Sequence, residues 1–136
     1  MTDRPVIAAL VRDLMLETRL EAAAAAVGAR LAVCASLDEL RQISDTQRPA
    51  LMLVDLGDPA FPAGAVVDAL PPASARPRLL GFYPHVQHEP ADLAKRSGYD
   101  TVVPRSRFLS DTTALLRRLL DEAAARQPTD GDTGRP

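Results

Sequence analysis

The sequence predicts an α/β fold in which a doubly wound, five-stranded parallel sheet carries helices on both faces. Short apolar runs alternate along the chain with segments whose apolar residues have helical spacing, which is typical of repeated strand–helix units. The apolar runs are nearly uninterrupted, as expected for strands that are buried on both faces. A length of 136 residues suits one domain with a substantial core.

The first half of the chain supplies three of the five strands. These strands are expected at residues 6–11, 30–35 and 50–55. A helix is expected over 14–27, because apolar residues recur there at helical spacing and Gly28 provides a stop. Ser36 and Glu39 have the spacing of a capping box, so a second helix should follow to about residue 44.

The second half begins with a proline-rich link. A weak helix is expected over 64–70, and Pro71, Pro72 and Pro77 then make the chain irregular. The remaining elements are a fourth strand, a helix, a fifth strand and a last helix, expected at residues 78–82, 90–97, 101–103 and from Ser110 or Asp111 onward. Residues 127–136 are polar and rich in Gly and Pro, so we expect one domain over 1–126 and a disordered tail.

Strand order decides which side chains share an edge of the sheet. The order 2-1-3-4-5 is expected for a doubly wound sheet with right-handed crossovers. It makes the first and third strands neighbours at the point where the order reverses. Ligands of such sheets bind outside the carboxyl ends of the strands. Arg12, Asp13 and Asp55 should therefore lie together there.

The sequence around the acid that ends the third strand is similar to that of a known protein family. Asp55 closes an apolar run, and a loop with Gly57, Asp58 and Pro59 follows. Over roughly residues 5 to 125 this pattern resembles the flavodoxin-like receiver domains of bacterial response regulators. In that family two acids after the first strand hold magnesium, and the acid ending the third strand accepts a phosphoryl group. The resemblance places Asp55 at the phosphoacceptor position, and Pro59 fits the usual proline four residues later.

The sequence departs from the family at the other functional positions. The acidic pair is Arg12-Asp13, and Tyr83 stands where the fourth strand usually ends in Ser or Thr. Arg105 and Ser106 stand where the family has Lys and then Pro. Magnesium needs oxygen ligands, so one lost carboxylate and an added cation weaken a site made of Asp13 and Asp55. We expect Arg12 to pair with Asp55 or Asp13 in place of the ion.

Two further segments on the same rim contain candidate residues. His85 and His88 are three residues apart, next to Glu89, a spacing that can bind a metal on a helix or simply flank one. Arg105 and Arg107 flank Ser106 after the last strand, where they could grip an anion or form a solvated loop with Phe108 tucked beneath the last helix. Asp58 is a candidate for weak metal binding, together with Asp13 and Asp55.

Three hypotheses for function follow. The first is a pseudo-receiver, not an enzyme, that acts in bacterial signal transduction by binding a protein and needs no efficient phosphorylation of Asp55. Its interaction face would run from the fourth strand to the last helix and could also support a homodimer, with contacts from Tyr83, Tyr99, Phe108, Leu115 and Leu119. The second is an active phosphoacceptor that uses Asp55 and magnesium. The third is a small ligand-binding protein or enzyme at the rim, with Asp55, Arg105 and His85.

Net charge and cysteine count indicate which classes of partner and which cellular compartment to expect. A net charge of −2, from 16 basic and 18 acidic residues, gives no sign of a nucleic-acid or membrane partner, so a protein partner of unknown identity is expected. Cys34 is the only cysteine, so the chain cannot form an internal disulfide and a reducing cytoplasm is the expected compartment. No resident cofactor is expected, apart from magnesium if Asp55 is phosphorylated.

Overall fold

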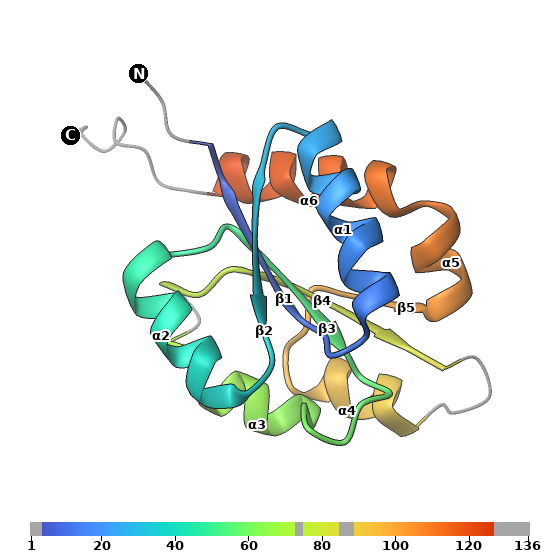
Figure 1. Cartoon of the computed structure of the whole chain (residues 1–136). Helices are drawn as coiled ribbons and strands as arrows, with labels where there is room; N and C mark the ends of the chain where they lie inside the picture. Colours follow the sequence, from blue (N-terminus) through green and yellow to red (C-terminus); the bar gives the residue numbers. More distant parts are fainter. Residues whose placement is uncertain (1–3, 73–74, 85–88, 127–136) are drawn as a thin grey trace.

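A computed structural model of the chain describes residues 4–72, 75–84 and 89–126. Its centre is one parallel sheet in the order β2-β1-β3-β4-β5, which confirms the predicted topology (Figure 1). The strands are β1 Val6–Leu10, β2 Arg30–Cys34, β3 Leu51–Asp55, β4 Arg78–Tyr83 and β5 Thr101–Pro104. The helices are α1 Leu14–Ala26, α2 Leu37–Gln47, α3 Ala63–Asp68, α4 Glu89–Arg96, α5 Arg105–Ser110 and α6 Thr112–Arg126.

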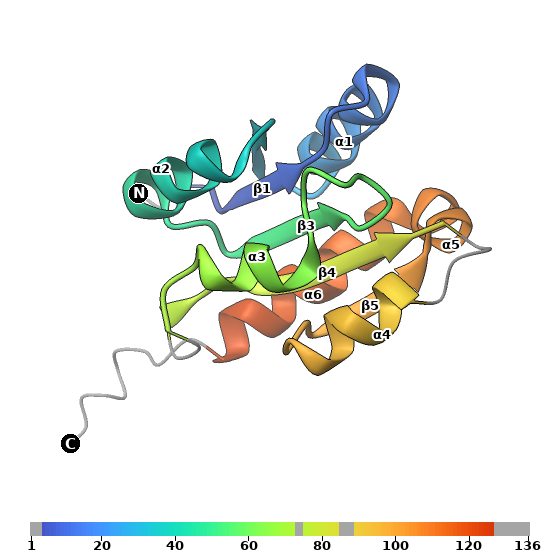
Figure 2. The same ribbon diagram turned by 90° about the horizontal axis from the view of Figure 1, so that it is seen from below.

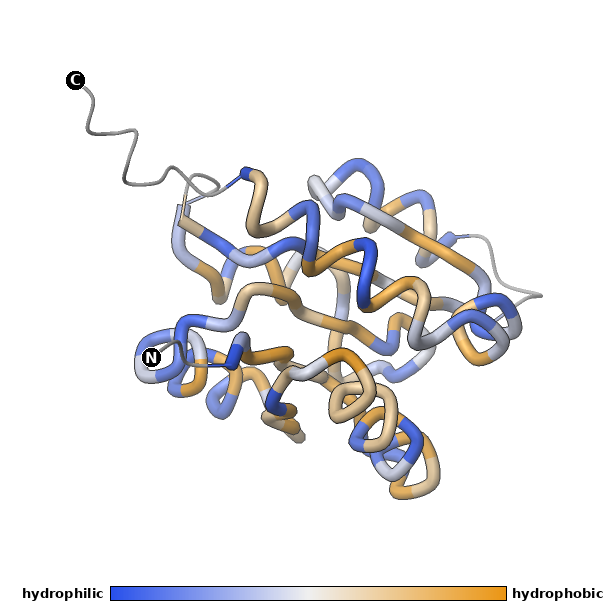
Figure 3. The backbone as a smooth tube through the Cα atoms, turned by 90° about the horizontal axis from the view of Figure 1, so that it is seen from above, coloured by the Kyte–Doolittle hydropathy of each residue, from blue (hydrophilic) through white to orange (hydrophobic). Residues whose placement is uncertain are grey.

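The helices cover both faces of the sheet. Helices α1, α5 and α6 lie on one face, and α2, α3 and α4 lie on the other (Figures 1 and 2). The three central strands are almost wholly apolar and buried, whereas hydrophilic and hydrophobic residues alternate along the helices (Figure 3). The predicted pattern of apolar strands buried on both faces is therefore confirmed.

Local signals set several boundaries as expected. The Oδ1 atom of Asp13 accepts hydrogen bonds from the backbone N–H groups of Met15 and Leu16, so Asp13 caps α1. Gly28, with φ +75°, allows the chain to leave α1 in the left-handed region. The Ser36 hydroxyl accepts from the N–H of Glu39 at 3.1 Å, which confirms the predicted cap, and α2 runs three residues further than expected.

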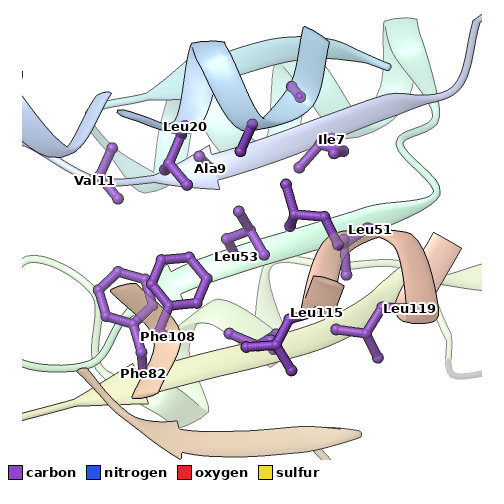
Figure 4. Close-up of a cluster of buried hydrophobic side chains, with 14 of the residues drawn as sticks. Ile7, Ala9, Val11, Leu20, Leu51, Leu53, Phe82, Phe108, Leu115 and Leu119 are labelled. Carbon is purple, nitrogen blue, oxygen red and sulfur yellow. The ribbon is translucent and has the colours of Figure 1, made fainter. Parts of the chain in front are cut away.

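The segment after β5 is not the solvated loop that was one of its two expected forms. Arg105–Ser110 form the short helix α5. Helix α6 begins after Asp111, as expected for the last helix. The ring of Phe108 is fully buried and stacks on Phe82, with 4.4 Å between ring centroids and 3° between ring planes. Figure 4 shows this pair beside the apolar side chains of β1, β3 and α6. The aromatic pair fixes α5 against the end of β4.

The predicted domain extent and tail are only partly within the structure. Residues 127–136 lie outside the described residues, as do His85 and His88. None of the helices in the described ranges is long and apolar enough to pass through a bilayer.

Candidate functional site

The carboxyl edge of the sheet gathers three acids and two arginines. Asp13 lies between β1 and α1, Asp55 ends β3, and Asp58 lies in the turn that follows. Arg12 precedes Asp13, and Arg105 is the first residue of α5. The order of β1, β3, β4 and β5 brings these segments to one edge, as the sequence predicted for Arg12, Asp13 and Asp55.

Arg12 binds Asp58. Its Nε and Nη2 atoms donate to the two carboxylate oxygens of Asp58, each at 2.7 Å. This is a bidentate, charge-assisted pair, which has more fixed geometry than a single contact. The prediction that Arg12 pairs with Asp55 or Asp13 is therefore wrong. The turn after β3 presents Asp58 to Arg12, because the Asp58 N–H bonds the backbone oxygen of Asp55 at 3.1 Å.

Arg105 is the cation that reaches the other two acids. One of its terminal nitrogens lies 3.3 Å from Oδ2 of Asp13, and the other lies 3.6 Å from Oδ2 of Asp55. The guanidinium carbon also lies 5.8 Å from the centre of the Phe82 ring, a cation–π distance. The Arg105 side chain is 34 % exposed and that of Asp55 is 14 % exposed, so both stand at the boundary between core and solvent.

The loop after β3 fixes the orientation of Asp55. Its Oδ1 atom accepts a hydrogen bond from the Gly57 N–H at 3.0 Å, which leaves Oδ2 to face Arg105. A Cβ atom added at Gly57 would lie 2.8 Å from Cγ of Pro84. The absence of a side chain at Gly57 therefore lets this loop pack against the end of β4 while its N–H holds Asp55.

The two acids of this loop have opposite pKa shifts. Burial raises the pKa of Asp55, and the Gly57 N–H and the charge of Arg105 only partly oppose this effect. The hydrogen bonds from Arg12 hold the pKa of Asp58 below its ordinary value. The ionised form of Asp58 is thus stabilised by Arg12. The ionised form of Asp55 is stabilised only by the Gly57 N–H and Arg105, against the cost of burial.

These residues do not fit a magnesium ion. The Asp13 oxygens face the start of α1 and Arg105, both Asp58 oxygens face Arg12, and the Asp55 oxygens face Gly57 and Arg105. A hard divalent cation would have to displace two guanidinium groups from three carboxylates. Among the described ranges, no group of three or more His, Cys, Asp or Glu side chains is arranged to hold a metal ion.

The other predicted site residues lie on the rim, outside the described residues or in the core. Tyr83 ends β4 on the same rim and is partly buried, and Ser106 is exposed on α5. His85 lies outside the described residues. The predicted interaction face is largely wrong, because its other side chains belong to the core: Tyr99, Phe108, Leu115 and Leu119 are at most 7 % exposed.

Sequence reasoning missed two features of the rim. Phe82 is the buried ring over which Arg105 lies, and nothing in its apolar run distinguished it from its neighbours. Leu14 and Met15, at the start of α1, are 74 % and 80 % exposed, although the helical pattern began with them.

A groove of about 500 Å³ lies between α1 and the junction of α5 and α6. Its lining includes Arg19 and Ala22 of α1 and Thr112 of α6. None of Asp13, Asp55, Asp58 or Arg105 lines it, so this groove does not support the hypothesis of an enzyme centred on Asp55.

The fold is shared with solved receiver domains. A CheY-like protein, TadZ of Pseudomonas aeruginosa PAO1, is 23 % identical and aligns over 85 % of this chain and 99 % of its own, with a TM-score of 0.68. The signal receiver domain of an HD domain-containing protein of Pseudomonas fluorescens Pf-5 is 10 % identical over 90 % of this chain and 99 % of its own, with a TM-score of 0.76. The chain has the receiver fold.

A third solved receiver domain also has this fold. It belongs to a sensor histidine kinase of Pseudomonas aeruginosa PAO1 and was solved with a magnesium ion coordinated in its active-site cleft. It is 14 % identical to this chain over 88 % of this chain and 99 % of its own, with a TM-score of 0.70. No protein-family model matches the chain, and no curated protein matches its sequence.

Proposed function

We propose that the chain is a pseudo-receiver: a cytoplasmic interaction module of bacterial signal transduction that binds a protein partner without phosphorylation of Asp55. The observation that carries the proposal is the pairing of Arg12 and Arg105 with all three acids of the rim. These side chains supply within the chain the positive charge that a metal ion would otherwise bring. The receiver fold of the neighbours supports a role in signalling.

The chemistry of phosphotransfer explains why the pairing matters. Attack of a carboxylate on a phosphoryl group brings two anions together, and a bound cation normally reduces their repulsion. Here Oδ2 of Asp55 faces Arg105, and Arg105 is itself shared with Asp13. The arginine shields the nucleophile in the resting state, and Arg12 occupies Asp58, the other loop carboxylate. These ion pairs favour a single conformation of the rim over one that changes with phosphorylation of Asp55.

The rim offers a surface that suits docking. Leu14 and Met15 project from the start of α1, next to Asp13 and Arg105. Since Asp13 both caps α1 and pairs with Arg105, the same contacts that close the acidic site fix the position of this apolar pair. A protein partner would meet two exposed apolar side chains bordered by the partly exposed Arg12 and Arg105.

The proposal is tested with a small phosphodonor. The chain is incubated with acetyl phosphate and magnesium, and its intact mass is measured over time. The wild-type mass should stay constant. The variant Arg12→Asp with Arg105→Lys should gain the mass of one phosphoryl group, because it gains a carboxylate beside Asp13 and loses the broad guanidinium fork in front of Asp55.

The active-phosphoacceptor hypothesis makes the opposite prediction. It is supported by the position of Asp55 at the strand end and by the modest 3.6 Å separation between Asp55 and Arg105. If the wild type gains a phosphoryl group and Asp55→Asn does not, the pseudo-receiver proposal is wrong. Circular dichroism of each variant checks that the fold is retained.

A further inference from the structure

In the described part of the chain, the edge strand β2 has a neighbouring strand on one side only. It is the outermost strand next to β1, and Figure 1 views the sheet from this edge, with α1 and α2 on its two sides and neither across it. Its central residues Leu31, Ala32 and Val33 are apolar and only partly buried. Edge strands are commonly protected by charges, prolines or bulges, and these three positions carry no such protection.

The opposite edge strand is protected in this way. Strand β5 has four residues and ends in Pro104, which has no N–H to offer a neighbouring strand. Helix α5 begins directly after it and so interrupts the edge. The two edges therefore differ, because β5 is protected against pairing and the centre of β2 is not.

The hydrogen bonds of β2 show which backbone groups face outward. The N–H of Arg30 bonds the backbone oxygen of Pro5, and the parallel register with β1 then directs Ala32 and Cys34 inward as well. The N–H and C=O groups of Leu31 and Val33 therefore point away from the sheet. Among the described residues these backbone groups, one residue on each side of Ala32, have no partner strand, and their pattern is complementary to its own copy in antiparallel orientation.

We infer that β2 pairs with β2 of a second copy of this chain, antiparallel about a two-fold axis at Ala32. Leu31 then lies opposite Val33 of the other copy, and the two such pairs exchange four backbone hydrogen bonds. Leu31 and Val33 already pack at the margin of the core beneath α1, so each copy extends the apolar margin of the other. The two five-stranded sheets become one sheet of ten strands.

Charge favours the antiparallel arrangement. Arg30 stands exposed at the start of β2, and no carboxylate within the described ranges forms an ion pair with it. Asp38 and Glu39 stand exposed just beyond the end of β2, in the first turn of α2, where Asp38 pairs with Arg41 of the same helix and Glu39 accepts from the Ala35 N–H. In the two-fold pairing, Arg30 lies opposite Cys34 of the other copy and approaches these acids, whereas a parallel pairing would place the two Arg30 side chains side by side.

This dimer does not depend on the state of Asp55. Strand β2 lies outside the cluster of Asp13, Asp55, Asp58 and the two arginines, and it uses a different face from the β4-to-α6 surface expected from the sequence. The dimer would present two copies of the Leu14–Met15 pair to a partner.

The first test compares the two sheet edges with the same substitution. Val33→Lys and Val102→Lys each place a lysine at a partly buried edge position, on β2 and β5 respectively. Sedimentation equilibrium should give the wild type and Val102→Lys twice the 14.6 kDa mass of one chain, and Val33→Lys the mass of one chain. A monomeric wild type, or a Val33→Lys variant that remains dimeric, overturns the inference.

A second test does not depend on how well the lysine variants fold. Residues that face each other without hydrogen bonds in an antiparallel pair have Cα atoms about 4.5 Å apart, which a disulfide can span. Ala32→Cys in a Cys34→Ala background should form a covalent dimer under mild oxidation. Ala35→Cys in the same background lies far from its counterpart and should not. Equal cross-linking of the two variants, or none at Ala32→Cys, contradicts the two-fold register.

Discussion

Removing Arg105 is the most informative perturbation of the rim. In Arg105→Met the side chain keeps much of its apolar length but loses its contacts with Asp13, Asp55 and the Phe82 ring. Partly exposed ion pairs contribute about 0.2–1 kcal/mol each, and a cation–π contact at an exposed site contributes about 0.5–1 kcal/mol. The free energy of unfolding at neutral pH should therefore fall by about 1–2 kcal/mol.

The loss should depend on pH, with a sign set by Asp55. Burial raises the pKa of Asp55 in the folded protein above its ordinary value of 3.8, so its protonated form favours folding at acid pH and its ionised form costs stability as pH rises. Arg105 reduces that cost only when Asp55 is ionised. The destabilisation by Arg105→Met should thus be larger at neutral pH than below about pH 4.

Urea unfolding followed by circular dichroism measures both effects. The matched control is Arg107→Met, on the same helix, because Arg107 is 56 % exposed and its ion pair with Asp111 spans 3.8 Å. The control should change the free energy of unfolding by less than about 0.5 kcal/mol. If Arg105→Met costs no more than Arg107→Met, or costs more at acid pH, Arg105 does not stabilise the acidic rim as described.

Three further predictions concern the scaffold. Phe108→Ala should lower the free energy of unfolding in urea by about 3–5 kcal/mol, because it removes a fully buried ring from its stack with Phe82; a loss below 1 kcal/mol would show that α5 does not depend on this stack. Gly81→Ala should lower the melting temperature, because its Cβ would lie 2.6 Å from Leu56 and 3.1 Å from the Tyr99 ring, whereas Gly64→Ala meets no atom within 4 Å and should not. Burial raises the pKa of the Cys34 thiol to about 11, so a thiol reagent at neutral pH should label Cys34 only after unfolding. Rapid labelling of the folded chain would contradict the burial of this thiol.

The fold could be predicted from the sequence because its strands are unusually explicit. The apolar run from Leu51 to Asp55 and the capping pair Ser36 and Glu39 are local patterns. Such patterns can be recognised in a sequence without knowing the tertiary contacts. Helix α5 was missed because it has six residues and no side-chain cap. Its stability comes from the contact of Phe108 with Phe82, 26 residues earlier in the chain, which no local pattern reveals.

The candidate site was predicted in its members but not in its pairing. The strand order alone brought Arg12, Asp13 and Asp55 to one edge. Which acid Arg12 binds depends on the turn that directs Asp58 toward it, and that turn is set by backbone hydrogen bonds and by the contact of Gly57 with Pro84. The interaction face failed for a related reason. Aromatic and leucine residues near a rim satisfy the core first, and burial of Tyr99 and Phe108 left little of them at the surface.

A titration followed by amide-resolved NMR tests the central claim most directly. Magnesium is added to the wild-type chain, followed by beryllium fluoride, which mimics a phosphoryl group on a carboxylate. Because Arg12 and Arg105 already occupy the acids, the amide resonances of Asp55, Tyr83 and Arg105 should not shift at millimolar ligand. Saturable shifts that begin at Asp55 and extend to Tyr83 and Arg105 would show a working phosphoryl switch and contradict the proposal.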